Sequence, residues 1–260
     1  LMALLNPGDV IAADALTYSG FKVIAQALHL EVLPIPAGQS GPDLDALERL
    51  CRTRPVRAIY TMPTLHNPLG WVMPLSERER LVAIARLYDL HIIEDAAYAY
   101  LAEDAPEPLA ELAPERTIYI SGISKSVATG LRVGFVAAPM QRVPLLERSI
   151  RATTWNTPGI LTAIVSSWLD DGTVARLEAE KRSDAQARQL VAKQALGELG
   201  QIGHRSSYFL WVPLSEDARA DQPRRILSRF ASQILLGQRA EHICHRLVQR
   251  SRLPLINQAS

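Results

Sequence analysis

The chain has 260 residues, of which 48% are hydrophobic and 21% charged, so we expect a folded, soluble protein with a sizeable core. A formal net charge of +1 gives no reason to expect nucleic acid or a membrane as partner. No apolar run reaches the roughly 20 residues of a membrane span, and residues 1–5 are too short for a signal peptide, so we expect a cytoplasmic protein.

Short apolar runs alternate with helical patterns along the first 140 residues, which indicates βαβ units and a mainly parallel sheet. Several runs are rich in Ile and Val without polar alternation, as expected of strands buried on both faces. The predicted strands are residues 10–13, 30–34, 58–61, 91–94, 117–121 and 133–137. The predicted helices are residues 19–27, 43–52 and 76–88, and Ser76 with Glu79 forms a capping-box pattern for the third.

The pattern changes after Pro144, where helices dominate. Residues 145–168 suggest two helices broken at Pro158 and Gly159, a long charged helix follows at 173–199, and 207–212 resembles a strand. We therefore predict an α/β fold with a large domain at 1–170, a connecting helix at 171–200 and a partial small α/β domain at 201–260.

The last segment is strongly basic, with eight Arg against two acids in residues 219–260, and a solvated basic face explains this better than a binding arm. The two cysteines, Cys51 and Cys244, do not make a disulfide scaffold, and no Cys/His cluster suggests zinc, so no metal site is expected.

Polar residues gather at the carboxyl ends of three predicted strands, where open α/β sheets place their ligands. The strand at 58–61 leads to Asn67, the strand at 91–94 to Asp95 and Tyr98, and the strand at 117–121 to Lys125 and then Arg132. These side chains are therefore expected to converge on one edge of the sheet.

Three segments in this order resemble the aminotransferase class I/II family of fold-type I, and especially the aminotransferase-like domain shared with MocR/GntR-type regulators. The motifs are P-x-x-x-N-P-x-G at 63–70, D-x-x-Y at 95–98 and S-K-x-x-x-x-G-L-R at 124–132. The resemblance covers roughly residues 4–215. It implies a fold-type I domain with a parallel central sheet flanked by helices, and pyridoxal 5′-phosphate (PLP) as cofactor.

The resemblance assigns catalysis to Lys125, Asp95 and Tyr98. Lys125 would form the internal aldimine with PLP and move protons, tasks that suit an amine with a lowered pKa. Asp95 would pair with the pyridinium nitrogen and keep it protonated. Taken alone, Lys125 could be a surface lysine in a loop, and Asp95 a helix cap after a strand.

Further cofactor contacts follow from the same resemblance. Tyr98 and Asn67 would hydrogen-bond the phenolic oxygen, Tyr18 would stack on the pyridine face, and Arg132 with Ser124 would bind the phosphate. A core tyrosine, a turn-forming Asn before Pro68 and simple packing of Tyr18 are the plainer alternatives. The family pattern also suggests a cis bond between Asn67 and Pro68.

The chain departs from the family pattern in three places. Gly122 stands where a Ser or Thr phosphate ligand is common, and we expect its small size to let backbone approach the anion. The main phosphate cradle and the segment that contacts a partner subunit would precede residue 1, so the chain resembles a truncated domain. The usual substrate-carboxylate Arg is not recognisable, and Arg246 and Arg252 are candidates by residue type alone.

The leading hypothesis is a PLP-dependent aminotransferase that moves an amino group between an amino acid and a 2-oxo acid through a Lys125 aldimine, as a homodimer. The alternative is the effector-binding domain of a MocR/GntR-type transcription regulator, which would contact DNA only through an N-terminal domain not contained in these 260 residues. An inactive fragment is a third possibility, and fold alone does not fix the reaction type.

Overall fold

The computed structural model describes residues 1–196 and 203–211. The chain divides into two units, Leu1–Gln189 with Ile202–Trp211 and Leu190–Gln201 with Val212–Ser260, and the described sheet lies wholly in the first unit. The predicted small domain, Arg246 and Arg252 fall mostly or entirely outside the described residues. The predicted domain limits therefore stay a prediction.

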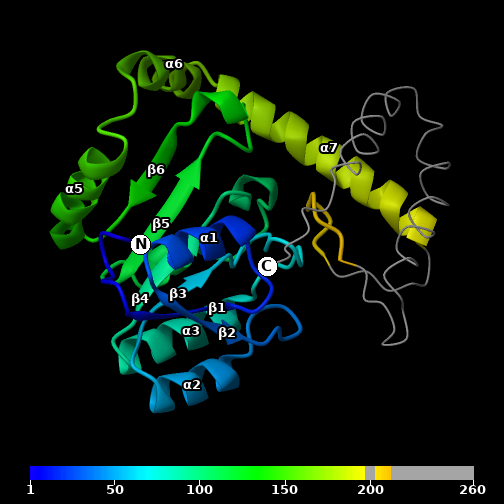
Figure 1. Ribbon diagram of the computed structural model, residues 1–260. Coiled ribbons are helices and arrows are strands. Elements are labelled where there is room, and N and C mark those ends of the chain that lie inside the picture. Colours follow the sequence, from blue (N-terminus) through cyan, green and yellow to red (C-terminus); the bar gives the residue numbers. More distant parts are fainter. Residues whose placement is uncertain (197–202, 212–260) are drawn as a thin grey trace, which may run out of the picture. The chain divides into compact units, whose positions relative to one another are not determined.

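A single six-stranded sheet organises the first unit, in the order β2-β1-β3-β4-β5-β6 (Figure 1). The first five strands are parallel, and β6 runs antiparallel to β5 at the edge. Each predicted strand is confirmed to within two residues at either end. The strands are β1 (Val10–Asp14), β2 (Glu31–Ile35), β3 (Val56–Thr61), β4 (His91–Asp95), β5 (Thr117–Gly122) and β6 (Gly134–Ala137).

Helices cover both faces of the sheet, which explains why β1 is buried along its whole length. The longer helices are α1 (Ser19–Ala27), α2 (Leu44–Thr53), α3 (Leu75–Leu87), α5 (Val143–Thr153), α6 (Gly159–Asp170) and α7 (Thr173–Leu196). The short ones are η1 (Ala99–Leu101), α4 (Leu109–Leu112), η2 (Thr129–Leu131) and η3 (Met140–Arg142). The predicted helices are confirmed, including the break at Pro158, whereas α4 was not predicted.

The alternation of side chains along the strands divides the core into two layers. Val10 and Ala12 of β1 pack with leucines of α2 and α3, whereas Ile11 and Ala13 pack with Phe21 of α1. Figure 1 shows α2 and α3 on one side of the sheet and α1 on the other. The continuous apolar strands predicted from the sequence therefore pack against a separate helix layer on each face of the sheet.

Two predictions of local structure were wrong. Helix α3 begins at Leu75 after Pro74, and Ser76 makes no capping bond, because the amides of Glu77 and Arg78 already bond the Pro74 carbonyl. Of the strand predicted at 207–212, residues 207–210 form no strand, Trp211 is a single bridge residue, and residue 212 lies outside the described residues. The Gln189 side chain instead bonds the carbonyls of Ser207 and Phe209, at 2.7 and 3.0 Å, so side-chain groups replace a strand partner.

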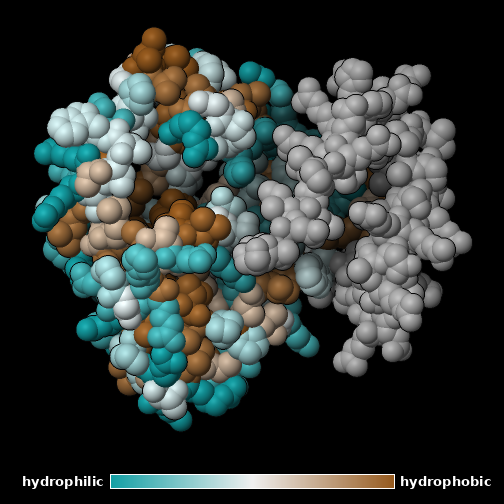
Figure 2. All heavy atoms as spheres, in the orientation of Figure 1, coloured by the Kyte–Doolittle hydropathy of each residue, from teal (hydrophilic) through white to brown (hydrophobic). Residues whose placement is uncertain are grey.

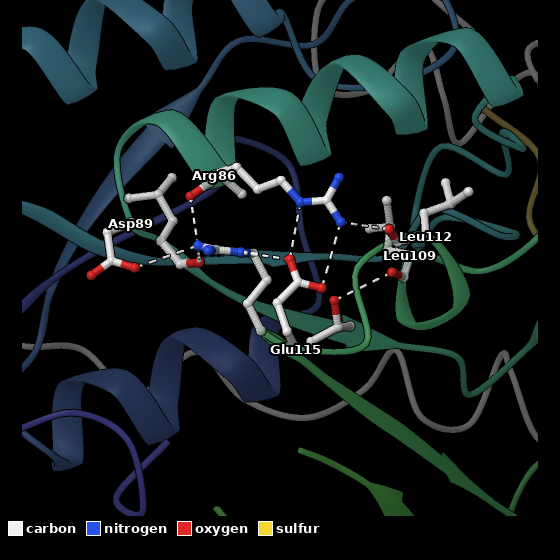
Figure 3. A network of polar contacts seen from close by, with 9 residues as sticks. Arg86, Asp89, Leu109, Leu112 and Glu115 are labelled. Atoms are coloured by element: carbon white, nitrogen blue, oxygen red, sulfur yellow. Dashed lines mark hydrogen bonds and ion pairs between the residues drawn. The ribbon is translucent and has the colours of Figure 1, made fainter. Parts of the chain in front are cut away.

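Polar contacts join the end of α3 to α4 and the start of β5 (Figure 3). Arg86 donates from Nε to the Glu115 carboxylate at 3.0 Å and from Nη2 to the Leu112 carbonyl at 2.9 Å. The hydroxyl of Thr117, the first residue of β5, donates to the Leu109 carbonyl at 3.3 Å. These contacts fix the short helix α4, which carries too few residues to show a helical pattern in the sequence.

Candidate active site

The carboxyl ends of β1, β3, β4 and β5 lie along one edge of the sheet, and the loops that leave them carry the predicted site residues. Tyr18 follows β1, Asn67 follows β3, Asp95 ends β4 with Tyr98 close behind, and Lys125 follows β5. The parallel arrangement of these four strands brings together positions that are more than a hundred residues apart in the chain.

Asp95 is held by two donors, one on each carboxylate oxygen. The Tyr60 hydroxyl donates to Oδ2 at 2.6 Å, and the Ala97 amide donates to Oδ1 at 3.0 Å. Asp95 as a whole is half-buried. A helix cap, the plainer alternative for Asp95, explains only the contact from the Ala97 backbone. The contact from the Tyr60 side chain is not part of a cap.

Tyr98 lies between the lysine loop and the segment at 203–211. The Lys125 Nζ is 5.8 Å from the centre of the Tyr98 ring, and the Phe209 ring meets it edge-on at 4.8 Å. Burial first, and then the charge of Asp95, raise the pKa of the Tyr98 hydroxyl. The hydroxyl therefore stays protonated at neutral pH and is available as a donor.

Lys125 lies on a short turn after β5. The Tyr100 hydroxyl donates to the Lys125 carbonyl at 3.0 Å, and the amides of Val127 and Ala128 bond the Ile123 carbonyl at 2.8 and 3.1 Å. The backbone of the turn is thus fixed while the Lys125 side chain is exposed. Within residues 1–196 and 203–211, Nζ makes neither a hydrogen bond nor an ion pair, and it lies over the Tyr98 ring.

The loop after β3 is tightly closed around the Asn67–Pro68 bond, which is cis as predicted. The Gly70 amide bonds the His66 carbonyl at 2.6 Å, and the His66 amide bonds the Trp71 carbonyl at 3.0 Å. Gly70 has a φ of +69° and packs closely on the Phe209 carbonyl, so a side chain would not fit there. The loop thus presents Asn67 from a rigid frame.

Two buried polar groups support this loop, and the sequence analysis missed both. Arg78 is fully buried and donates to the carbonyls of Pro63 and Met73, at 3.2 and 2.9 Å. His66 is also fully buried, and its Nε2 lies 3.2 Å from Asp14 Oδ2 without the alignment of a hydrogen bond. Arg78 shares an apolar helix face with residues 81, 82 and 85, a spacing that could have shown its burial from the sequence.

The remaining predicted residues surround the site without direct contacts among themselves in the described part of the chain. Arg132 is exposed and adopts a left-handed conformation with a φ of +52°. Tyr18 is 45% exposed, and its ring lies over Gly20, where a Cβ would overlap it. Neither Asn67 nor Ser124 has a recorded side-chain hydrogen bond among the described residues, so their roles toward a ligand stay predictions.

Gly122 has a different reason for its small size than the one predicted. A Cβ there would meet the Val133 carbonyl oxygen at 3.0 Å and the Gly134 Cα at 3.2 Å. Gly122 and Gly134 are register partners in the β5–β6 pair. The glycine therefore serves the close approach of two strands, and its predicted approach to an anion stays a prediction.

The geometry agrees with the comparison to known families. A model of the family described as aminotransferase class I and II matches residues 1–250. The chain belongs to this family.

Relatives within the family include both enzymes and regulators. The 2-aminoadipate transaminase of Thermus thermophilus is 30% identical over 230 residues, 84% of this chain and 57% of that protein. YdeF of Bacillus subtilis, named an uncharacterized HTH-type transcriptional regulator, is 27% identical over 240 residues, 92% of this chain and 52% of the regulator. The chain thus spans about half the length of the curated relatives that it matches.

Solved aminotransferases share the fold. The multiple substrate aminotransferase of Thermococcus profundus matches with a TM-score of 0.79 at 25% identity, over 86% of this chain and 60% of that one. LysN, the alpha-aminoadipate aminotransferase of Thermus thermophilus, was solved with N-(5′-phosphopyridoxyl)-L-leucine. It matches with a TM-score of 0.77 at 28% identity, over 87% and 61% of the two chains. The first unit is thus a fold-type I domain.

The described residues contain no helix long and apolar enough to cross a membrane. They also contain no group of three or more His, Cys, Asp or Glu side chains placed to hold a metal ion.

Proposed function

We propose that this chain is the catalytic domain of a PLP-dependent aminotransferase that moves an amino group between an amino acid and a 2-oxo acid. The observation that carries the proposal is the Lys125 amine over the Tyr98 ring, on the same sheet edge as the Asp95 carboxylate, whose two oxygens each accept a hydrogen bond. A primary amine beside an aromatic ring and near a fixed carboxylate suits a group that must react with the cofactor's carbonyl.

The groups present fit PLP by their chemistry. An exposed primary amine suits the cofactor's carbonyl, a half-buried carboxylate suits its ring nitrogen, and a protonated phenol suits its phenolic oxygen. When bound, PLP supplies a carbonyl that condenses with amines and a ring that withdraws electrons from the substrate Cα. Arg132 and Ser124 are proposed for the phosphate, because a guanidinium and a hydroxyl both donate to phosphate oxygens.

Each site residue of this chain would then have its own role. Lys125 Nζ would take the proton from the substrate Cα, since its turn is fixed by Tyr100 while its side chain is free. Asp95 would orient the ring nitrogen, because both of its oxygens are already held by donors. Tyr98 would donate from its hydroxyl, with Asn67 beside it and Tyr18 covering the ring.

The test uses the purified chain with added PLP. We expect a visible absorption band that survives desalting and is absent in Lys125→Ala, because only an amine at this position can bind the cofactor covalently. Lys181→Ala is the matched control, since Lys181 lies on α7, outside the loops that carry the predicted site residues. Adding an amino acid and a 2-oxo acid should then give measurable amino-group transfer. A wild-type chain that retains no PLP would contradict the proposal and leave an inactive fragment.

A second candidate is a PLP-containing effector domain of a transcription regulator. It is favoured by the regulators among the relatives, of which YdeF matches 92% of this chain. The same experiment separates the two functions. A sensor would bind the amino acid and change the spectrum without releasing a 2-oxo acid, whereas an aminotransferase releases one equivalent for each cofactor converted.

We propose in addition that the domain is a homodimer. Large hydrophobic side chains are exposed on and around β6, α5 and α6, and Figure 2 shows hydrophobic residues gathered over α6. Exposed apolar side chains that gather on a surface often mark a contact with another protein. The most exposed of these residues are Met140, Trp155 and Ile160.

A further inference from the structure

We propose that Tyr60 is a positioning residue, which holds the Asp95 carboxylate in the orientation that the cofactor's ring nitrogen requires. This inference rests on the proposed PLP function and adds a residue that lies outside the three family motifs. The observation behind it is the 2.6 Å hydrogen bond from the Tyr60 hydroxyl to Asp95 Oδ2, made from β3 to the end of the neighbouring strand β4.

The contact restricts Asp95 because the second oxygen is held from another direction. The Ala97 amide bonds Oδ1 at 3.0 Å from the turn that follows β4. The backbone bond alone would leave the carboxylate free to rotate about its Cβ–Cγ bond, and the phenol removes that freedom. A ligand therefore meets a carboxylate whose plane is set before binding.

Tyr60 is itself a fixed donor. Its side chain is only 4% exposed, and its ring stacks on Phe21 of α1 with centres 4.0 Å apart and planes 8° from parallel. Burial, and then the negative charge of Asp95, raise the pKa of its hydroxyl far above the ordinary range. The phenol therefore keeps its proton and donates across the whole working pH range.

Replacing Tyr60 by Phe removes only this donor, because the ring, its stacking on Phe21 and its volume are retained. The Asp95 carboxylate then loses one of its two partners while staying half-buried. A hydrogen bond to a charged group is lost, so we expect the dissociation constant for PLP to rise by roughly 10-fold. The transamination rate should fall at unchanged apparent affinity for the amino acid.

The experiment is a double-mutant cycle read out by spectroscopic titration with PLP. We compare wild type, Tyr60→Phe, Asp95→Ala and the double variant, each checked for folding by thermal unfolding without cofactor. If Tyr60 acts through Asp95, Tyr60→Phe raises the dissociation constant in the wild-type background and has no further effect when Asp95 is Ala. Tyr88→Phe is the matched control, because among the described residues that hydroxyl bonds only Arg52, at the surface.

Two results would overturn the inference alone. One is an unchanged PLP dissociation constant in a folded Tyr60→Phe variant, and the other is an equal loss in both backgrounds of the cycle. A wild-type chain that binds no PLP would instead contradict the proposed function. The experiment therefore distinguishes a failure of the Tyr60 inference from a failure of the proposed PLP function.

Discussion

Arg78 is a charged side chain with no carboxylate in hydrogen-bond contact among the described residues. Its guanidinium lies in the interior and donates to four backbone carbonyls and to the Thr64 hydroxyl. Burial lowers its pKa, and the charge of Glu94 acts in the opposite direction. Because the acceptors lie on separate loops, one side chain joins the loop after β3 to the segment before α4.

We expect Arg78→Met to destabilise the domain by about 3 kcal/mol or more, because several buried carbonyls lose their donor together. Urea unfolding followed by circular dichroism measures the change. Arg80→Met is the matched control two positions along the same helix, where the side chain is exposed and pairs with Asp45. Equal unfolding midpoints for the two variants would contradict the role assigned to Arg78.

The residues found from the sequence differ from those missed in one physical respect. Lys125, Asp95 and Tyr98 follow strands, so their place on the sheet edge was predictable, and their proposed roles come from the family resemblance of the ordered motifs. Tyr60 and His66 act through partners that only folding brings near. For Tyr60 the partner is 35 positions away on a neighbouring strand, and no local pattern indicates that contact.

At the scale of elements, the strands and long helices were predictable because their apolar patterns extend over at least four residues. The start of α3 was not, because a proline carbonyl competes with the predicted Ser76 cap. The segment at 207–211 was mistaken for a strand because it is apolar, although its backbone is satisfied by Gln189. The apolar pattern of a sequence predicts which residues are buried more reliably than it predicts the hydrogen-bond partners of their backbone.

The β5–β6 pair gives an element-scale prediction. Gly122→Ala places a methyl group 3.0 Å from the Val133 carbonyl oxygen, so the strands must separate at a cost of about 1–3 kcal/mol. Because Lys125 follows three residues later, PLP retention should fall as well. Gly159→Ala, at the open start of α6, should leave both unfolding and PLP retention nearly unchanged. Equal stability and equal PLP retention in the two alanine variants would contradict this prediction.

The junction in Figure 3 gives a prediction on pH. The Arg86 hydrogen bond, as the largest cause, lowers the pKa of Glu115 from its ordinary value of 4.5 to about 2. A lowered pKa in the folded state stabilises the fold above pH 4.5, and this stabilisation is lost as the pH falls toward 2. Glu115→Gln should therefore be less stable than wild type at about pH 6, by under about 1 kcal/mol because the pair is partly exposed.

Unfolding measured at about pH 6 and at about pH 2.5 tests this. The difference between Glu115→Gln and wild type should shrink at the lower pH. A difference that is constant with pH would show that the carboxylate charge of Glu115 plays no part at this junction.

At the scale of the whole molecule, the exposed apolar side chains around α6 bear on assembly. If they form a contact between two copies, replacing Trp155 and Ile160 by Asp should convert a dimer to a monomer, because each buried charge would lack a partner. Sedimentation velocity across a range of concentrations measures this. Leu87→Asp, an exposed residue on α3, is the control. A wild-type chain that stays monomeric would contradict the proposed homodimer.

The antiparallel direction of β6 has a consequence for the loop that carries Lys125 and Arg132. Because β6 returns beside β5, the loop starts and ends at one pair of facing glycines, Gly122 and Gly134, and its inner turn is closed on Ile123. A short loop pinned at both ends has little conformational entropy left to lose when a ligand arrives. The backbone that carries Lys125 and Arg132 is thus ordered during folding, and ligand binding need not order it.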